Sequence, residues 1–213
     1  LALAAQRAET AFREAVRAVC AVPTRGQGTR PLVGVVGEIF VRCNPFCNDH
    51  VIREIERLGG EAWLAPVSEW GLYVGEVQRW RARKRPFAFA AVMSAYVKNW
   101  PVHYMERKYL RLASPFLDDR EEPPIGEVLR EGENYLPANF SGEAIITLGR
   151  AVHFARQGAK LIVNVAPFGC MPGTITSSVF LELKDVLGIP IITQFYDGDL
   201  DVNDKVSALL RTM

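Results

Sequence analysis

The sequence predicts an α/β fold built on a doubly wound, four-stranded parallel sheet. Short, continuous apolar runs occur in both halves of the chain, and segments with apolar residues at helical spacing separate them. Continuous apolar runs are typical of parallel strands, because such strands are buried on both faces. Alternation of these strands with helices is typical of a sheet of the Rossmann or flavodoxin type.

The first half of the chain predicts a strand–helix–strand unit after an N-terminal helix. Apolar residues at helical spacing predict an amphipathic helix over 1–22, and the run LVGVVG predicts the first strand at 32–37. Asn48 or Asp49 can cap a helix that ends at Leu58, before two glycines. The run AWLAPV predicts the second strand at 62–67. The connection between two such parallel strands is nearly always right-handed.

The second half repeats this alternation. A helix is expected over 142–157 and is followed by a strand at 159–165, where the sequence reads AKLIVNV. A second helix over 174–187 precedes a fourth strand at 189–193, and a last helix is expected over 201–211. The two halves together predict one sheet of four parallel strands.

Residues 70–135 separate the two halves and carry most of the aromatic side chains, at helical spacing and without a strand pattern. They predict a helical insertion of two or three helices, broken near Pro86, Pro101, Pro115 and the pair at 123–124. We therefore expect a single α/β domain over 1–213. Because the chain opens with LALAA and no initiator methionine, we expect it to be a piece of a longer protein.

Composition excludes several classes of partner. Lys and Arg number 25 against 24 Asp and Glu, and no long basic block occurs, so a nucleic-acid partner is not expected. No run of 18 apolar residues is present to span a membrane. Four cysteines are too few for a disulfide framework, and no secretory signal precedes them, which predicts a reducing, cytoplasmic location. Walker A, GxGxxG and GxSxG motifs are missing.

Cysteines follow two of the predicted strands. Cys43 and Cys47 come after the first strand and Cys170 after the third, so all three are expected at the carboxyl edge of the sheet. Thiolates there predict an iron–sulfur, zinc or copper site. With His50 as a fourth ligand, a closed zinc site is also possible. The alternative is that these are ordinary half-buried cysteines, as we expect for Cys20 on its helix.

Charged side chains follow the first two strands. Glu38 and Glu69 are expected at the same edge, where two carboxylates could act as catalytic groups in proton transfer. Equally, each could cap a loop by accepting from backbone N–H groups. Arg42 could hold an anionic ligand or pair with one of these carboxylates.

Four motifs at the strand ends carry a resemblance to a known family. They are GEIFVR at 37–42 with Asn48-Asp49, WLAPVSEW at 63–70, Ser141-Gly142-Glu143, and PFGCMP at 167–172. With them the chain resembles the 2-hydroxyacyl-CoA dehydratase D-component family, and more closely the C-terminal region of large CoA-substrate-specific enzyme activases. The motifs lie within residues 34–203, which is most of the chain.

The resemblance implies a redox role. It implies a 4Fe–4S or double-cubane iron–sulfur cluster held by cysteines, with Cys170 matching the family's cysteine after the late strand. It also implies low-potential electron transfer driven by an ATP-dependent activator, acting on an acyl-CoA. The family's other cluster cysteines lie in an upstream domain, so other domains of the parent chain are expected partners. This chain is then not expected to be active alone.

Two other functions stay open from the residues. One is a non-catalytic interaction or scaffold domain of the same large protein, in which the cysteines remain thiols. The other is a small zinc-binding domain that uses His50.

Overall fold

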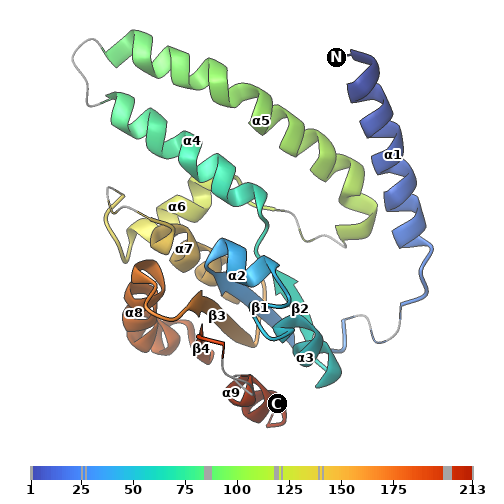
Figure 1. Cartoon of the computed structure of the whole chain (residues 1–213), viewed down its shortest axis with the longest axis vertical. Coiled ribbons are helices and arrows are strands. Elements are labelled where there is room, and N and C mark those ends of the chain that lie inside the picture. The colour runs from blue at the N-terminus through green and yellow to red at the C-terminus, as the bar shows by residue number, and fades with distance from the viewer. Residues whose placement is uncertain are drawn as a thin grey trace. The chain divides into compact units, whose positions relative to one another are not determined.

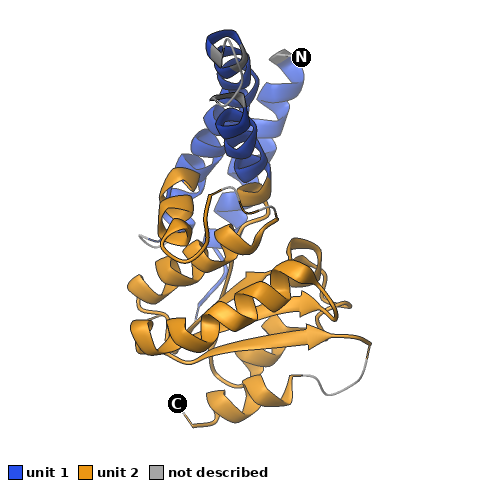
Figure 2. Cartoon of the chain, turned by 90° about the vertical axis from the view of Figure 1, so that its left-hand side faces the viewer, with its two compact units in different colours: residues 1–27, 71–124 blue, residues 28–70, 125–213 orange. Residues whose placement is uncertain are grey.

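The chain forms two compact units. The computed structural model describes residues 2–24, 26, 28–83, 88–117, 120, 122–138, 140, 142–198 and 203–212. Residues 1–27 and 71–124 make up one unit, here called the helical unit. Residues 28–70 and 125–213 make up the other, here called the sheet unit (Figure 2). Whether the whole chain acts as one domain stays a prediction.

The sheet unit contains one parallel sheet of four strands (Figure 1). Its strands are β1 (Leu32–Gly37), β2 (Glu61–Leu64), β3 (Leu161–Pro167) and β4 (Ile191–Tyr196). They lie in the order β2-β1-β3-β4, and Val35 of β1 is in register with Leu64 of β2 and Val163 of β3. The predicted α/β class and the parallel four-stranded sheet are confirmed.

Helices cover both faces of this sheet. They are α2 (Ile39–Cys43), α3 (Val51–Arg57), α6 (Ile125–Glu133), α7 (Ala144–Arg156), α8 (Met171–Leu187) and α9 (Asp204–Leu210). Residues of α3 and α9 belong to one apolar cluster with the sheet, and residues of α7 and α8 belong to another. Helix α6 packs against α7. The sheet is therefore doubly wound, as predicted.

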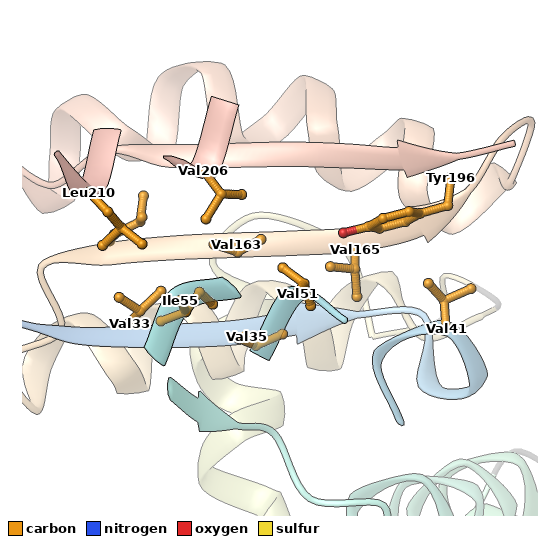
Figure 3. Close-up of a cluster of buried hydrophobic side chains, with 11 residues drawn as sticks. Val33, Val35, Val41, Val51, Ile55, Val163, Val165, Tyr196, Val206 and Leu210 are labelled. Atoms are coloured by element: carbon orange, nitrogen blue, oxygen red, sulfur yellow. The ribbon is translucent and has the colours of Figure 1, made fainter. Parts of the chain in front are cut away.

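The first core cluster fills the space between the sheet and helices α3 and α9 (Figure 3). Val33 and Val35 of β1 alternate with residues that face the other side, and Val51 and Ile55 of α3 are one helical turn apart. All four are fully buried. Burying such a side chain contributes about 1.5–3 kcal/mol, so this cluster is a main source of the stability of the unit.

The second core cluster lies on the opposite face of the sheet. Leu148 and Val152 of α7 and Leu183 of α8 pack with Ile162 of β3, and all are buried. Ile162 is a neighbour in sequence of Val163, whose side chain joins the first cluster. Because successive side chains of a strand point to opposite faces, the continuous apolar run of β3 supplies both cores.

Element boundaries differ from the prediction at several ends. Strand β2 ends at Leu64 rather than 67, and β3 and β4 begin two residues later than predicted and run to 167 and 196. Helix α8 begins at Met171 rather than 174, because Pro172 fits the first helical turn, where its missing N–H is no loss. Helix α2 was not predicted. It occupies part of the segment expected to be a loop.

The helical unit consists of α1 (Ala2–Cys20), most of α4 (Ser68–Arg83) and α5 (Ala88–Leu117). Helix α1 packs on α5, where the rings of Phe12 and Tyr109 meet edge to face at 4.8 Å and Lys108 Nζ lies 2.5 Å from Glu9. Helix α5 also contacts α4, because the Asn99 side chain donates to the Gly75 carbonyl at 3.1 Å.

The predicted breaks at Pro101 and Pro115 are wrong, because both prolines lie inside the continuous helix α5. A proline removes one backbone hydrogen bond and bends a helix but does not end it where packing holds both sides. Here Asn99 and Tyr109 anchor the segments on either side of Pro101. Pro86 lies outside the described residues. Helix α6, within the predicted insertion, belongs to the sheet unit.

Among the described helices, none is both long enough and apolar enough to cross a membrane.

Candidate functional site

The carboxyl ends of β1 and β3 form the switch point of the sheet. The chain runs from β1 to its neighbour β2 through α3 on one face, and it returns to β3 through α7 on the other face. In open parallel sheets, ligands bind outside the strand ends at the place where the winding reverses. The residues that follow β1, β2 and β3 therefore form the candidate site.

Gly37 lets the chain leave β1 close to β3. It has a φ of 112°, and a Cβ at this position would lie 2.1 Å from the carbonyl oxygen of Val165. The next residue, Glu38, donates its N–H to that same carbonyl at 2.8 Å. Any side chain at 37 would break this approach, which explains why glycine begins the GEIFVR motif.

Glu38 caps the short helix α2. Its carboxylate accepts hydrogen bonds from the Phe40 N–H at 3.1 Å and the Val41 N–H at 2.8 Å. Both oxygens of Glu38 are used by backbone donors, which is the capping role that the sequence left open. The proton-transfer role of Glu38 stays a prediction.

Arg42 is buried beneath α2 and joins two loops. Its side chain is 1% exposed and donates to the Gly37 carbonyl at 3.0 Å and to the Pro66 carbonyl at 3.2 Å. The same guanidinium lies 3.6 Å from the carboxylate of Glu69. Of the two alternatives for Arg42, the structure shows the pairing with a carboxylate.

Glu69 lies between two arginines in the first turn of α4. Arg42 approaches one carboxylate oxygen, and the Nε of Arg150 donates to the other at 3.2 Å. Both Glu69 and Arg150 are buried. Arg150 comes from α7, 81 residues along the chain, and nothing in the sequence marked it as part of this site. The triad fixes the start of α4 to the edge of the sheet.

Glu143 stands directly before α7 at the same edge. It is 9% exposed and accepts a hydrogen bond from the backbone of Ile39. Burial raises the pKa of its carboxyl to about 7, with Glu38 and Glu69 adding to the rise and Arg42 opposing it. In the sequence, Glu143 was noted only as part of the motif at 141–143 and was not predicted to be a functional residue. Its position before a buried helix was the signal that could have marked it.

Asn48 holds the loop after α2 to the rest of the unit. It donates to the carbonyls of Val41 and Arg42 and accepts from the Val51 N–H, while Asn203 donates to the Asp49 carbonyl at 2.8 Å. The Asn48-Asp49 pair therefore has a structural role, although α3 begins at Val51 with His50 as its N-cap.

Three cysteines lie at this edge, and the described side chains there are not grouped around a metal position. Cys43 ends α2, Cys47 lies in the following turn and Cys170 is the N-cap of α8, and all three are half-buried free thiols. Among the described residues, no group of three or more His, Cys, Asp or Glu side chains is placed to hold a metal ion. The structure therefore brings together neither the three thiols nor a zinc set with His50.

Apolar side chains are exposed on the segments that follow the strands at the same edge. Phe46 is 90% exposed and Phe168 is 75% exposed, and Phe40, Val67 and Met171 are also exposed. We call these five residues the apolar rim. They come from the segments after β1, β2 and β3, so the rim spans the edge that carries Cys170. Clusters of exposed apolar residues mark interaction surfaces.

Comparisons with models of protein families, with curated proteins and with solved structures find no match. A function must therefore be inferred from the residues at the carboxyl edge of the sheet. This edge offers a half-buried thiol at a helix start, a carboxyl group that titrates near neutral pH, and an apolar rim.

Proposed function

We propose that the sheet unit supplies one wall of a composite iron–sulfur site and serves low-potential electron transfer in a system like the 2-hydroxyacyl-CoA dehydratases and their activases. The resemblance of the strand-end motifs to that family supports this proposal. The motifs at 37–42, 63–70 and 167–172 all end at the carboxyl edge of the sheet.

The apolar rim is the observation that carries the proposal. Large apolar side chains from the segments after three strands are exposed at this edge. Among the described residues, no group of three or more ligand side chains is placed there to hold a metal ion. A second polypeptide that covers the rim would exclude water and could add the missing thiolates. Because solvent exposure and hydrogen bonds to the sulfurs set the potential of a cluster, covering the edge would also tune the site.

Cys170 is the residue that we assign as the ligand from this chain. It precedes the 17-residue helix α8 and makes no side-chain capping bond, so its sulfur is not engaged by its own helix. An anionic sulfur at this place would face the positive end of the helix dipole. Cys43 and Cys47 are further candidates from the first loop. A bound cluster would supply a one-electron carrier.

In this proposal the remaining partners are those of the family. An ATP-dependent activator would deliver the electron, and an acyl-CoA would be the eventual acceptor. Other domains of the parent chain would provide the missing cluster ligands.

Anaerobic reconstitution with iron, sulfide and an excess of a small thiol tests the proposal, because the small thiol can take the place of the missing ligands. We expect the chain to gain iron, acid-labile sulfide and a visible absorption band, and we expect Cys170→Ser to lose them. Cys20→Ser is the matched control, since Cys20 is exposed on α1 and is expected to leave binding unchanged. Equal iron in the wild type and in Cys170→Ser would refute the assignment.

Two other results would favour the alternative functions. A stoichiometric zinc ion that is lost in His50→Ala would favour a zinc-binding domain. Protein that stays colourless and metal-free with small thiols present would favour an interaction or scaffold domain, which the apolar rim also fits.

A further inference from the structure

Three carboxylates share the carboxyl edge of the sheet, and their surroundings differ. Glu38 has both oxygens bound to backbone N–H groups of α2. Glu69 lies between the guanidinium groups of Arg42 and Arg150. The carboxylate oxygens of these two residues thus face backbone N–H groups or guanidinium groups.

Glu143 is the third carboxylate, and it has a different environment. Within the described part of the chain, it accepts a hydrogen bond from the backbone of Ile39. Its Oε2 atom is buried and has no hydrogen-bond partner among the residues that the structure describes. A buried carboxylate oxygen without a donor is costly when charged, whereas a protonated oxygen carries no charge and can itself donate.

We propose that Glu143 is the proton-exchanging residue of this edge, holding a proton on Oε2 and passing it to a basic oxygen of a ligand or of water. The exchange involves no redox change: the O–H bond of the carboxylic acid breaks, a new O–H bond forms on the acceptor, and the carboxylate remains. This role extends beyond the proposed iron–sulfur site and does not depend on it.

The charges around Glu143 support this assignment. Burial is the largest cause that raises the pKa of Glu143 to about 7, Glu38 and Glu69 add to the rise, and Arg42 opposes it. The strands β1 and β3 and the first turn of α8 carry no ionisable side chain. On α6, Glu127, Arg130 and Glu133 are exposed, and Glu131 pairs with Arg156 at the far end of α7.

The net charge of the edge adds to the effect of burial on Glu143. With Glu143 neutral, the two carboxylates Glu38 and Glu69 balance the two guanidiniums Arg42 and Arg150. Ionisation of Glu143 adds an unbalanced negative charge to a largely buried cluster. A carboxylic acid that exchanges its proton near neutral pH is suited to general acid–base work, because the best catalysts titrate near the working pH.

Carbon-13 NMR of the glutamate carboxyl groups in the full chain tests the proposal. We expect one carboxyl signal to titrate with a midpoint near 7 and to be missing in Glu143→Gln. We expect Glu38→Gln to move that midpoint to lower pH, because it removes a neighbouring negative charge. Glu127→Gln is the matched control, since Glu127 is exposed on α6, and it should leave the midpoint unchanged.

Two results would overturn the proposal. One is that every glutamate titrates in the ordinary range, at about pH 4 to 5. The other is that a signal near pH 7 persists in Glu143→Gln, which would place the proton on another carboxylate such as Glu69. If Glu143→Gln does not fold, through-bond correlation from the carboxyl carbon to the Glu143 backbone assigns the signal in the wild type and gives the same decision.

Discussion

Arg42 has the largest of the fully buried side chains among the described residues, and its guanidinium joins the segments that follow β1 and β2. The sequence marked Arg42 as a charge near a predicted strand end. Its burial follows from partners 24 and 27 residues away, Pro66 and Glu69, which only the folded sheet brings near.

Replacing Arg42 by methionine is expected to lower the free energy of unfolding by about 3–5 kcal/mol. The substitution leaves Glu69 with one guanidinium and removes the donor to the carbonyls of Gly37 and Pro66. Urea unfolding followed by circular dichroism measures the loss. Arg130→Met, at an exposed position of α6, is the control and should change stability by less than about 0.5 kcal/mol. Equal effects of the two substitutions would contradict the structural role of Arg42.

Because the pKa of Glu143 is raised in the folded chain, we expect the free energy of unfolding to fall as the pH rises. The pKa of Glu143 is about 7 in the folded chain, above the ordinary value of 4.5, so the folded state binds more protons between these two values than the unfolded state does. Its contribution is complete below about pH 4.5 and is lost as the pH rises through about 7. Urea unfolding at a series of pH values measures this slope. The slope should be smaller in Glu143→Gln, and an unchanged slope would argue against a raised pKa.

Because the pKa of His153 is lowered in the folded chain, we expect its contribution to the free energy of unfolding to increase with pH. Burial, Arg150 and Arg156 lower the pKa of His153 to about 4 from 6.5, so the unfolded state binds more protons between these values. Its contribution is complete above about pH 6.5 and is lost as the pH falls through about 4. His153→Phe, beside the rings of Trp63 and Phe154, should remove this part of the acid sensitivity. Thermal unfolding at several acidic pH values would show it, and equal sensitivity of both proteins would contradict it.

Helices α6 and α7 approach so closely that small residues are required between them. A Cβ on Gly149 of α7 would lie 1.9 Å from the carbonyl oxygen of Val128 on α6. Gly126, also on α6, has open space where its Cβ would be. The two glycines therefore differ in packing and share a helical environment.

Alanine at these two glycines should have opposite effects. Gly149→Ala is expected to destabilise the chain by at least about 1–3 kcal/mol, because the backbones must separate. Gly126→Ala is expected to stabilise it by up to about 1 kcal/mol, since alanine favours the helix. Thermal unfolding of both variants measures the difference. A destabilised Gly126→Ala, or a neutral Gly149→Ala, would show that the helices pack differently.

Sequence patterns located the strands of this fold but not helix α2 or the uninterrupted course of helix α5. Apolar runs located all four strands, because burial on both faces leaves a continuous signal. Helix α2 was missed, because five residues are too few for a periodic pattern and the helix depends on the cap from Glu38 and the anchor of Arg42. The prolines of α5 were misjudged, because the packing of α1 and α4 on that helix is not visible in its local sequence.

At the scale of the whole molecule, the sequence predicted which edge of the sheet carries the conspicuous residues but not how they group. Topology alone brings the segments after β1, β2 and β3 to one edge, so the positions of Cys170, Glu38 and Glu69 at that edge could be expected. Side-chain directions and the distances between loops decide ligation. The described thiols do not meet in a metal-holding group, whereas Arg150 joins the edge without having been expected there.

We propose that this edge is the binding face of the chain and that Cys170 is the cluster ligand that it contributes. Alkylation of the thiols, followed by mass spectrometry, tests it most directly when protein reconstituted with iron and sulfide is compared with untreated protein. We predict that reconstitution protects Cys170 from alkylation and leaves the exposed Cys20 as reactive as before. Cluster-loaded protein in which Cys170 reacts as fast as it does in untreated protein would contradict the claim.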